Sequence, residues 1–234
     1  MRFSQSLTLG ALILGAATAS AQVTPRRFAV SPRGGYLSFE KASGLEGTPV
    51  IGLDAMYAFN RYFMIGTGLS AARPSTRGQD FIASLTFGDT TLLVEVKQPV
   101  TLLDVNLAAM LRWPGATFSP YFIGSVGSYT LYLDQQVVGS NRKFSKLSAT
   151  AGVGVNYRVS EGAGLQLDVR DFIFTDYDRD QLNPAAARFA NIRFPEDVPV
   201  PPAAKKTVHN LMFSLGFSFT PTLAGGTPEE ETTP

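Results

Sequence analysis

The sequence has no cysteine and only one histidine, His209, which excludes a disulfide framework and a metal site built from cysteine and histidine. Neither charge is in excess, because 20 Lys and Arg stand against 19 Asp and Glu. This balance gives no electrostatic reason to expect a nucleic-acid partner. After the first 21 residues, no apolar run has the length of a membrane-spanning helix. If the chain crosses a membrane, it must do so as a closed barrel.

The first 21 residues have the organisation of a secretory signal peptide. Arg2 is their only charge, residues 7–19 form an apolar core, and Ala19-Ser20-Ala21 fits the small-x-small cleavage pattern. The core is too short for a membrane anchor. We therefore predict a signal peptide over residues 1–21, cleaved after Ala21, which leaves a mature chain with equal numbers of basic and acidic residues.

The stretch 209–219 alternates with a period of two, which is the pleat of a β-strand. Its odd positions from Leu211 are large and apolar, whereas its even positions are mostly small or polar. A strand between lipid and a polar lumen shows this pattern, but so does a strand of a soluble sandwich. The decision between the two depends on the rest of the chain.

Eight segments of strand character follow one another, separated by turn signals. They are residues 34–40, 50–59, 62–71, 94–113, 120–133, 147–158, 164–175 and 209–219. Short connections follow the second, fourth and sixth segments, whereas long ones follow the others. Short turns at one end and long loops at the other are typical of outer-membrane barrels. The pattern predicts an all-β fold, an eight-stranded antiparallel up-and-down transmembrane β-barrel.

Three local features refine this prediction. Residues 81–87 and 90–96 flank Gly88-Asp89, which indicates a projecting hairpin or, as the minor alternative, two further strands of a ten-stranded barrel. The run Asp171-Phe172-Ile173 breaks the alternation and is typical of a β-bulge. Aromatic residues gather near the short turns, where a membrane interface favours them. These are Phe59, Tyr62, Phe63, Trp113, Tyr121, Tyr157 and Phe219.

From about Ala29 to Phe219, the chain resembles the small outer-membrane β-barrel family, which includes the transmembrane domain of outer membrane protein A and its single-domain relatives. Two motifs carry the resemblance: residues 165–172, Leu-Gln-Leu-Asp-Val-Arg-Asp-Phe, and the terminal strand that closes on Phe219. The resemblance implies an outer-membrane barrel over residues 22–219, in contact with lipid. It also implies that the outer-membrane assembly machinery reads the terminal strand, through Phe213, Leu215, Phe217 and Phe219.

Residues 220–234 extend past the phenylalanine at which many members of that family stop. Proline, threonine, glycine and glutamate dominate this stretch, and it has almost nothing to bury. We predict a disordered tail, which lies in the periplasm together with the other terminus of the barrel.

Several charged residues fall on the face of the strands that we expect to line the lumen. They are Glu40, Asp54, Asp104, Arg112, Arg158, Asp168 and Arg170. A charge inside a narrow barrel is tolerable only when it is paired or hydrated. We therefore expect a lumen charge network centred on Arg170, which either fills the barrel or lines a gated conduit for ions.

No catalytic, cofactor or metal site is predicted. His209 has no serine two residues away that would share its face, because residue 211 is leucine. The expected role is structural, for envelope integrity, or an interaction through the long extracellular loops, whose ligand the sequence does not name. The alternatives are a narrow pore for ions or small solutes, a lipid-modifying enzyme and a soluble periplasmic barrel that binds a ligand. We expect a monomer with no nucleic-acid partner.

Overall fold

The computed structural model describes residues 28–87, 89–133, 142–160, 162–182, 192–193 and 202–220. The predicted signal peptide and nearly all of the predicted tail lie outside these residues, so both stay predictions. Within the described ranges, no helix is long and apolar enough to pass through a membrane.

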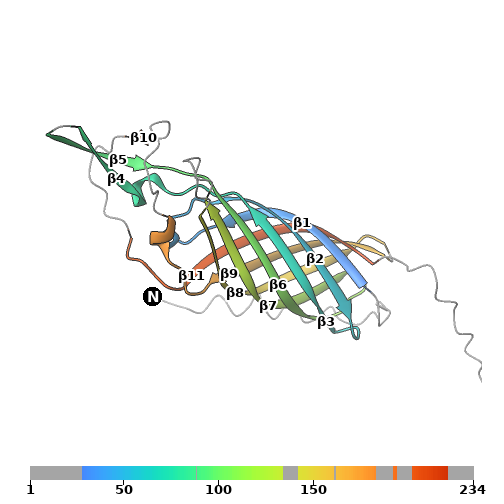
Figure 1. Cartoon of the computed structure of the whole chain (residues 1–234). Helices are drawn as coiled ribbons and strands as arrows, with labels where there is room; N and C mark the ends of the chain where they lie inside the picture. Colours follow the sequence, from blue (N-terminus) through green and yellow to red (C-terminus); the bar gives the residue numbers. More distant parts are fainter. Residues whose placement is uncertain are drawn as a thin grey trace, which may run out of the picture.

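Eight antiparallel strands close into one barrel in the order β1-β11-β9-β8-β7-β6-β3-β2 (Figure 1). They are β1 (Phe28–Ser38), β2 (Thr48–Ala58), β3 (Phe63–Ala72), β6 (Val100–Arg112), β7 (Phe118–Leu133), β8 (Arg142–Arg158), β9 (Ala163–Phe174) and β11 (Val208–Phe219). The first and last strands complete the ring, with Gly35 opposite Ser214. The predicted eight-stranded antiparallel fold is confirmed.

A second, smaller sheet extends beyond the end of the barrel that carries the long loops (Figure 1). It consists of β4 (Ile82–Phe87), β5 (Thr90–Val96) and β10 (Ile192–Arg193), in the order β10-β5-β4. β4 and β5 form an antiparallel hairpin that is not part of the barrel. The projecting hairpin is therefore confirmed, and the ten-stranded alternative is wrong.

The strands alternate between an apolar outward face and an inward face. On β11, Phe213, Leu215, Phe217 and Phe219 point outward and are 47–52% exposed, whereas Met212 points inward and is 2% exposed. At the short-turn end, most of the predicted rim aromatics are also exposed, and Phe59 lies against Phe63 there. An outward face of this composition requires an apolar solvent around the barrel.

The predicted rim position of Tyr121 and the predicted bulge at residues 171–173 are both wrong. Tyr121 points into the lumen and is 3% exposed. The pairing of β9 with β11 continues without interruption, with Phe172 opposite Asn210 and Ile173 opposite His209. Phe172 and Phe174 simply point inward, because this part of the lumen is filled with apolar side chains rather than polar ones.

Candidate functional site

The centre of the lumen holds a buried charge network around Arg170. Arg170 Nη2 lies 2.7 Å from Asp54 Oδ2 on β2, and Arg170 Nε lies 3.0 Å from Asp168 Oδ1, two residues away on β9. Arg33, on β1, contacts the same Asp54 oxygen through Nε at 3.3 Å and donates through Nη2 to Ser70 Oγ at 2.7 Å. Two guanidinium groups and two carboxylates thus neutralise one another out of reach of water.

Asp168 is the most heavily hydrogen-bonded carboxylate of the lumen. Ser214 Oγ donates to its Oδ1 at 2.6 Å, and Tyr121 Oη donates to its Oδ2 at 3.0 Å. Gln166 Nε2 donates in turn to Tyr121 Oη at 2.7 Å. The inward tyrosine therefore orients the network, since its hydroxyl connects β7 to β9.

Asp104, on β6, belongs to the same polar layer without a direct cation. Asn106 Nδ2 and Ser148 Oγ each donate to one of its oxygens, at 2.6 Å. With Arg33, Asp54 and the side chains named above, every one of the eight barrel strands contributes to the layer. A network of this extent fixes the side chains across the lumen, because most of its polar groups have a partner on another strand.

Glycines make room for the network on the inner wall. A Cβ atom at Gly68 would lie 2.9 Å from Asp54 Oδ1 and 2.6 Å from Asn106 Oδ1. A Cβ at Gly154 would lie 2.3 Å from the ring of Tyr121. A larger side chain at either position would displace a network member, so these glycines are needed for close approach.

The structure brings some of the predicted lumen charges together and separates others. Asp54, Asp168 and Arg170 form the centre, and Asp104 lies in the same layer. Arg112 and Arg158 point inward at the short-turn end, and neither forms an ion pair with the described residues. Their part in the lumen is therefore separate from the central network.

Glu40 does not join the network, because the chain leaves the barrel wall after Ser38 and turns into the 3-10 helix η2 (Lys41–Ser43). Its carboxylate instead pairs with Lys205 and accepts a hydrogen bond from the backbone N–H of His209 at 2.9 Å. The hydrogen bond from Lys205, and then that from His209, lower the pKa of the Glu40 carboxyl. Glu40 thus fastens the β1 end to β11 at the rim.

Arg33 is the member of the network that the sequence analysis missed. The first strand was predicted to begin at residue 34, whereas β1 begins at Phe28 and includes Pro32. The signal was present, since Arg33 shares the parity of Gly35 and Leu37, and Leu37 points inward. β1 tolerates Pro32 because residues 31 and 32 are not paired with β11. The N–H group that proline lacks is therefore not needed in that ladder.

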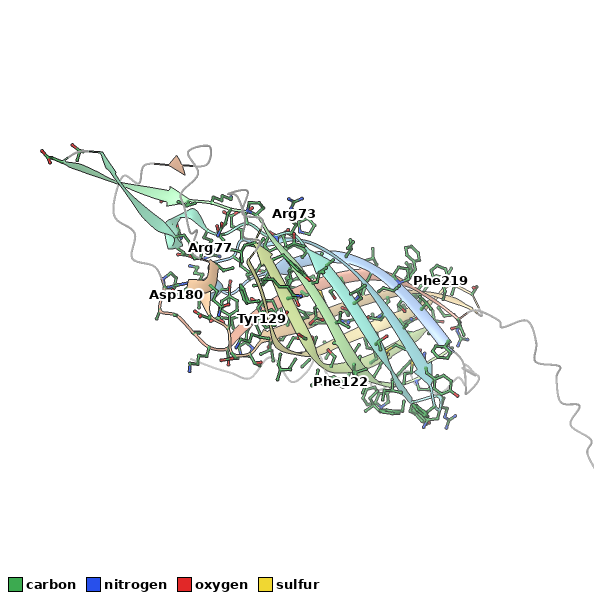
Figure 2. The ribbon with its side chains drawn as sticks, viewed as in Figure 1. Arg73, Arg77, Phe122, Tyr129, Asp180 and Phe219 are labelled. Atoms are coloured by element: carbon green, nitrogen blue, oxygen red, sulfur yellow. The ribbon has the colours of Figure 1, made fainter. Side chains whose placement is uncertain are left out.

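The loop end of the lumen is closed by an apolar cap. Tyr129 on β7 stacks on Phe174 of β9, with ring centroids 4.1 Å apart, and Figure 2 shows Tyr129 toward this end of the barrel. The loops complete the cap from above, with Leu45 after η2, Phe81 after η3 (Gly78–Asp80) and Leu182 in η4 (Arg179–Leu182), all of them buried. The polar layer is therefore shut off from the loop side by packed hydrophobic side chains.

Two polar groups fix the loops of the cap. The buried Tyr177 hydroxyl donates to the backbone carbonyl of Ser43 at 2.6 Å, and burial raises the pKa of this hydroxyl. Arg179 Nη1 donates to the carbonyl of Pro202 at 2.6 Å. Asp80 Oδ2 is buried without a hydrogen-bond partner in the described part of the chain, and burial raises the pKa of its carboxyl.

His209 lies on the outward face at the loop end, beside an acidic residue. Its Nδ1 is 2.7 Å from Asp171 Oδ2 on the neighbouring strand β9, and both side chains are well exposed. No serine hydroxyl is hydrogen-bonded to this histidine within the described ranges. The same ranges contain no group of three or more His, Cys, Asp or Glu side chains placed to hold a metal ion.

Comparison with known proteins identifies the class. Residues 7–189 match the family model described as outer membrane protein beta-barrel domain, and the chain belongs to that family. No curated protein sequence matches the chain.

Several solved structures are similar to the chain. Neisserial surface protein A is similar with a TM-score of 0.51 and 12% identity, over 82% of this chain and 96% of that chain. Ail, the attachment invasion locus protein of Yersinia pestis, gives a TM-score of 0.45 and 12% identity, over 84% of this chain and 100% of that chain. The outer membrane protein OprG of Pseudomonas aeruginosa gives a TM-score of 0.44 and 15% identity, over 84% of this chain and 98% of that chain. At 12% identity the likeness to Neisserial surface protein A concerns the fold alone. This fold and the family together define the class, an outer-membrane β-barrel protein.

Proposed function

We propose that this protein is a closed outer-membrane barrel that acts by surface contact through its loop end, and neither conducts solutes nor catalyses a reaction. The observation that carries the proposal is the filled lumen. The ion pairs of Arg170 cross its centre, and the stack of Tyr129 on Phe174 lies above them. Eight-stranded barrels have interiors that side chains just fill, which argues against the narrow pore.

The orientation follows from the two unlike ends of the barrel. The short turns lie at one end, where the aromatic rim is, and the capped loops with the β4-β5-β10 sheet lie at the other (Figure 1). In outer-membrane barrels, short turns face the periplasm and long loops face the outside. We infer that the signal peptide is removed, that both termini are periplasmic and that the small sheet projects from the cell surface.

A hairpin is a suitable contact element because it presents free backbone groups. β4 is an edge strand, and its sequence, Ile-Ala-Ser-Leu-Thr-Phe, has no charge and no proline. Such an edge can pair with an extended segment of another molecule. The exposed His209 and Asp171 are instead assigned to the polar rim, since no nucleophile is bonded to them.

Conductance tests the closed lumen. The full mature chain, inserted into a planar bilayer, should show no steady conductance, because the network and the cap obstruct the lumen at two depths. The same preparation must show the heat-modifiable gel shift of a folded barrel. A steady, large single-channel conductance from the folded protein would restore the pore.

Replacement of the hairpin tests the surface contact. Exchanging residues 82–96 for a short Gly-Ser linker should leave the eight-stranded barrel intact, since no barrel strand pairs with β4 or β5. Cells that display this variant should lose most of the adherence to polystyrene and to one another that the wild-type chain confers. His209→Ala, at the rim of the same end, should retain it. Equal adherence with and without the hairpin would contradict the proposal.

A further inference from the structure

The outward face of β7 and β8 changes from apolar to polar toward the loop end. Val126 on β7 and Leu147 on β8 are apolar and are 65% and 70% exposed. The outward positions beyond them are polar, and the two strands stay paired there. Thr101 on β6 continues this surface, because it lies opposite Tyr132. The resulting β7–β8 polar patch consists of Thr101, Ser128, Thr130, Tyr132, Lys143 and Ser145, and none of these residues is acidic.

The patch lies directly above the lipid-facing wall. On β8, Leu147 is ten residues away from Tyr157, which lies at the short-turn end. Ten residues span about 33 Å along a strand. At a strand tilt of about 40°, this is about 25 Å along the membrane normal, the height of the apolar band of an outer-membrane barrel. Leu147 therefore marks the upper limit of the hydrocarbon, and Ser145 and Lys143 lie at the depth of the lipid head groups.

Hydroxyl groups, an aromatic ring and an ammonium group lie together in the patch. The hydroxyls of Thr130 and Ser145 are 2.8 Å apart across the two strands. The Nζ atom of Lys143 lies 5.8 Å from the centroid of the Tyr132 ring. Hydroxyls can both donate to and accept from the hydroxyls of a sugar, and tyrosine combines an apolar ring with a polar tip. Because lysine is a common ligand of phosphate, the combination fits a phosphorylated sugar.

We propose that the β7–β8 polar patch binds the phosphorylated sugar head group of an outer-leaflet lipid, whose acyl chains pack on Val126 and Leu147. The occupant is a lipid because the patch continues the lipid-facing wall without a break, with Ser128 directly opposite Leu147. Acyl chains held on the wall keep the head group at a high effective concentration beside Lys143. The assignment to the outer leaflet rests on the orientation proposed above, with the loop end outside.

Native mass spectrometry of the folded full mature chain tests the site. The probe is lipid A, a bisphosphorylated diglucosamine lipid, added to detergent micelles together with an excess of phosphatidylcholine. At limiting concentration, the wild-type chain should retain one molecule of the probe. Lys143→Gln should weaken retention about tenfold, because a hydrogen bond to a charged group is lost. This loss should vanish with the dephosphorylated probe, whereas Tyr132→Ala should weaken retention of both forms.

Lys41→Gln is the matched control, because it removes an exposed lysine of η2 at the same end of the barrel but outside the patch. It should retain the probe as the wild-type chain does, and the heat-modifiable gel shift reports folding of each variant. Equal retention by Lys143→Gln and Lys41→Gln would overturn the proposal, and so would equal retention of phosphatidylcholine. If inorganic phosphate alone binds as tightly as the probe, the patch is a site for free anions and the proposal fails.

The orientation is measured separately, because binding in micelles depends neither on the direction of the barrel in the cell nor on adherence. The chain has no cysteine, so Lys41→Cys gives a single site at the loop end for a membrane-impermeant maleimide. Intact cells should be labelled from outside. Labelling only after the outer membrane is ruptured would overturn the assignment to an outer-leaflet lipid. Loss of adherence without the hairpin, by contrast, bears on the proposed function alone.

Discussion

Arg170→Gln should lower the free energy of unfolding of the barrel by about 3–5 kcal/mol, the usual cost of removing one partner from a buried ion pair. Arg170 contacts both Asp54 and Asp168, and its side chain is 4% exposed. Without it, Asp54 keeps its contact with the guanidinium of Arg33, whereas Asp168 loses the only cation that contacts it among the described residues. Urea unfolding in lipid vesicles, followed by the fluorescence of the single tryptophan, Trp113, measures the loss.

The double variant Arg170→Gln/Asp168→Asn provides the control. It removes one charge of each sign and leaves the pair of Arg33 and Asp54 in place. It should be more stable than Arg170→Gln alone, because Asp168 is then no longer a buried carboxylate that has lost its cation. The single variant Asp168→Asn completes the cycle. If the losses of stability in Arg170→Gln and Asp168→Asn add up to the loss in the double variant, the two side chains are not coupled, and the ion pair is not the origin of the loss.

The barrel itself could be predicted from the sequence because the outward faces of all its strands meet the same apolar surroundings, the lipid. Every strand has large apolar residues on one side, as on β11, so a period of two is visible from end to end. The alternation of short and long connections indicated in addition which end of each strand lies at the short-turn end of the barrel. The strand character of β4 and β5 was recognisable from the sequence. Their place outside the barrel could only be favoured, because the other eight strands already suffice to close it.

The inner face was harder to predict because the lumen is not uniform. It is polar at the depth of Asp168 and apolar at the depth of Phe174, so the polarity of a side chain does not identify the inward face. Tyr121 was assigned to the rim for this reason, although its hydroxyl binds Asp168. Phe172 was interpreted as a sign of a bulge for the same reason, since an apolar residue was not expected to point inward.

Strand ends caused the remaining differences. The first segment was predicted to begin at residue 34, whereas β1 begins at Phe28, so the predicted network lacked the central cation Arg33. At the other end of β1, the prediction of an inward Glu40 is wrong on two counts, because the odd positions of β1 point inward and the wall ends at Ser38. Alternation is informative only while a strand continues, and it says nothing of where the chain leaves the sheet.

Leu215→Arg should destabilise the barrel by about 2–4 kcal/mol, the cost of an arginine on the lipid face at the middle of the membrane. Leu215 lies in the middle of β11, opposite Gly34 and Leu167, and is 50% exposed on the outward face. The substitution both removes an apolar contact with lipid and places a charge there. The heat-modifiable gel shift should therefore be lost or strongly reduced.

Ser218→Lys on the same strand is the matched control, because Ser218 belongs to the inward set and accepts a hydrogen bond from Asn156 at 2.7 Å. A lysine there meets polar groups near the mouth of the lumen rather than lipid, so the gel shift should persist. Both variants add one positive charge to β11 and differ in the face that carries it. Equal tolerance of the two would mean that the outward face of β11 is not in lipid, because a charge in hydrocarbon cannot be as favourable as one at a hydrated mouth.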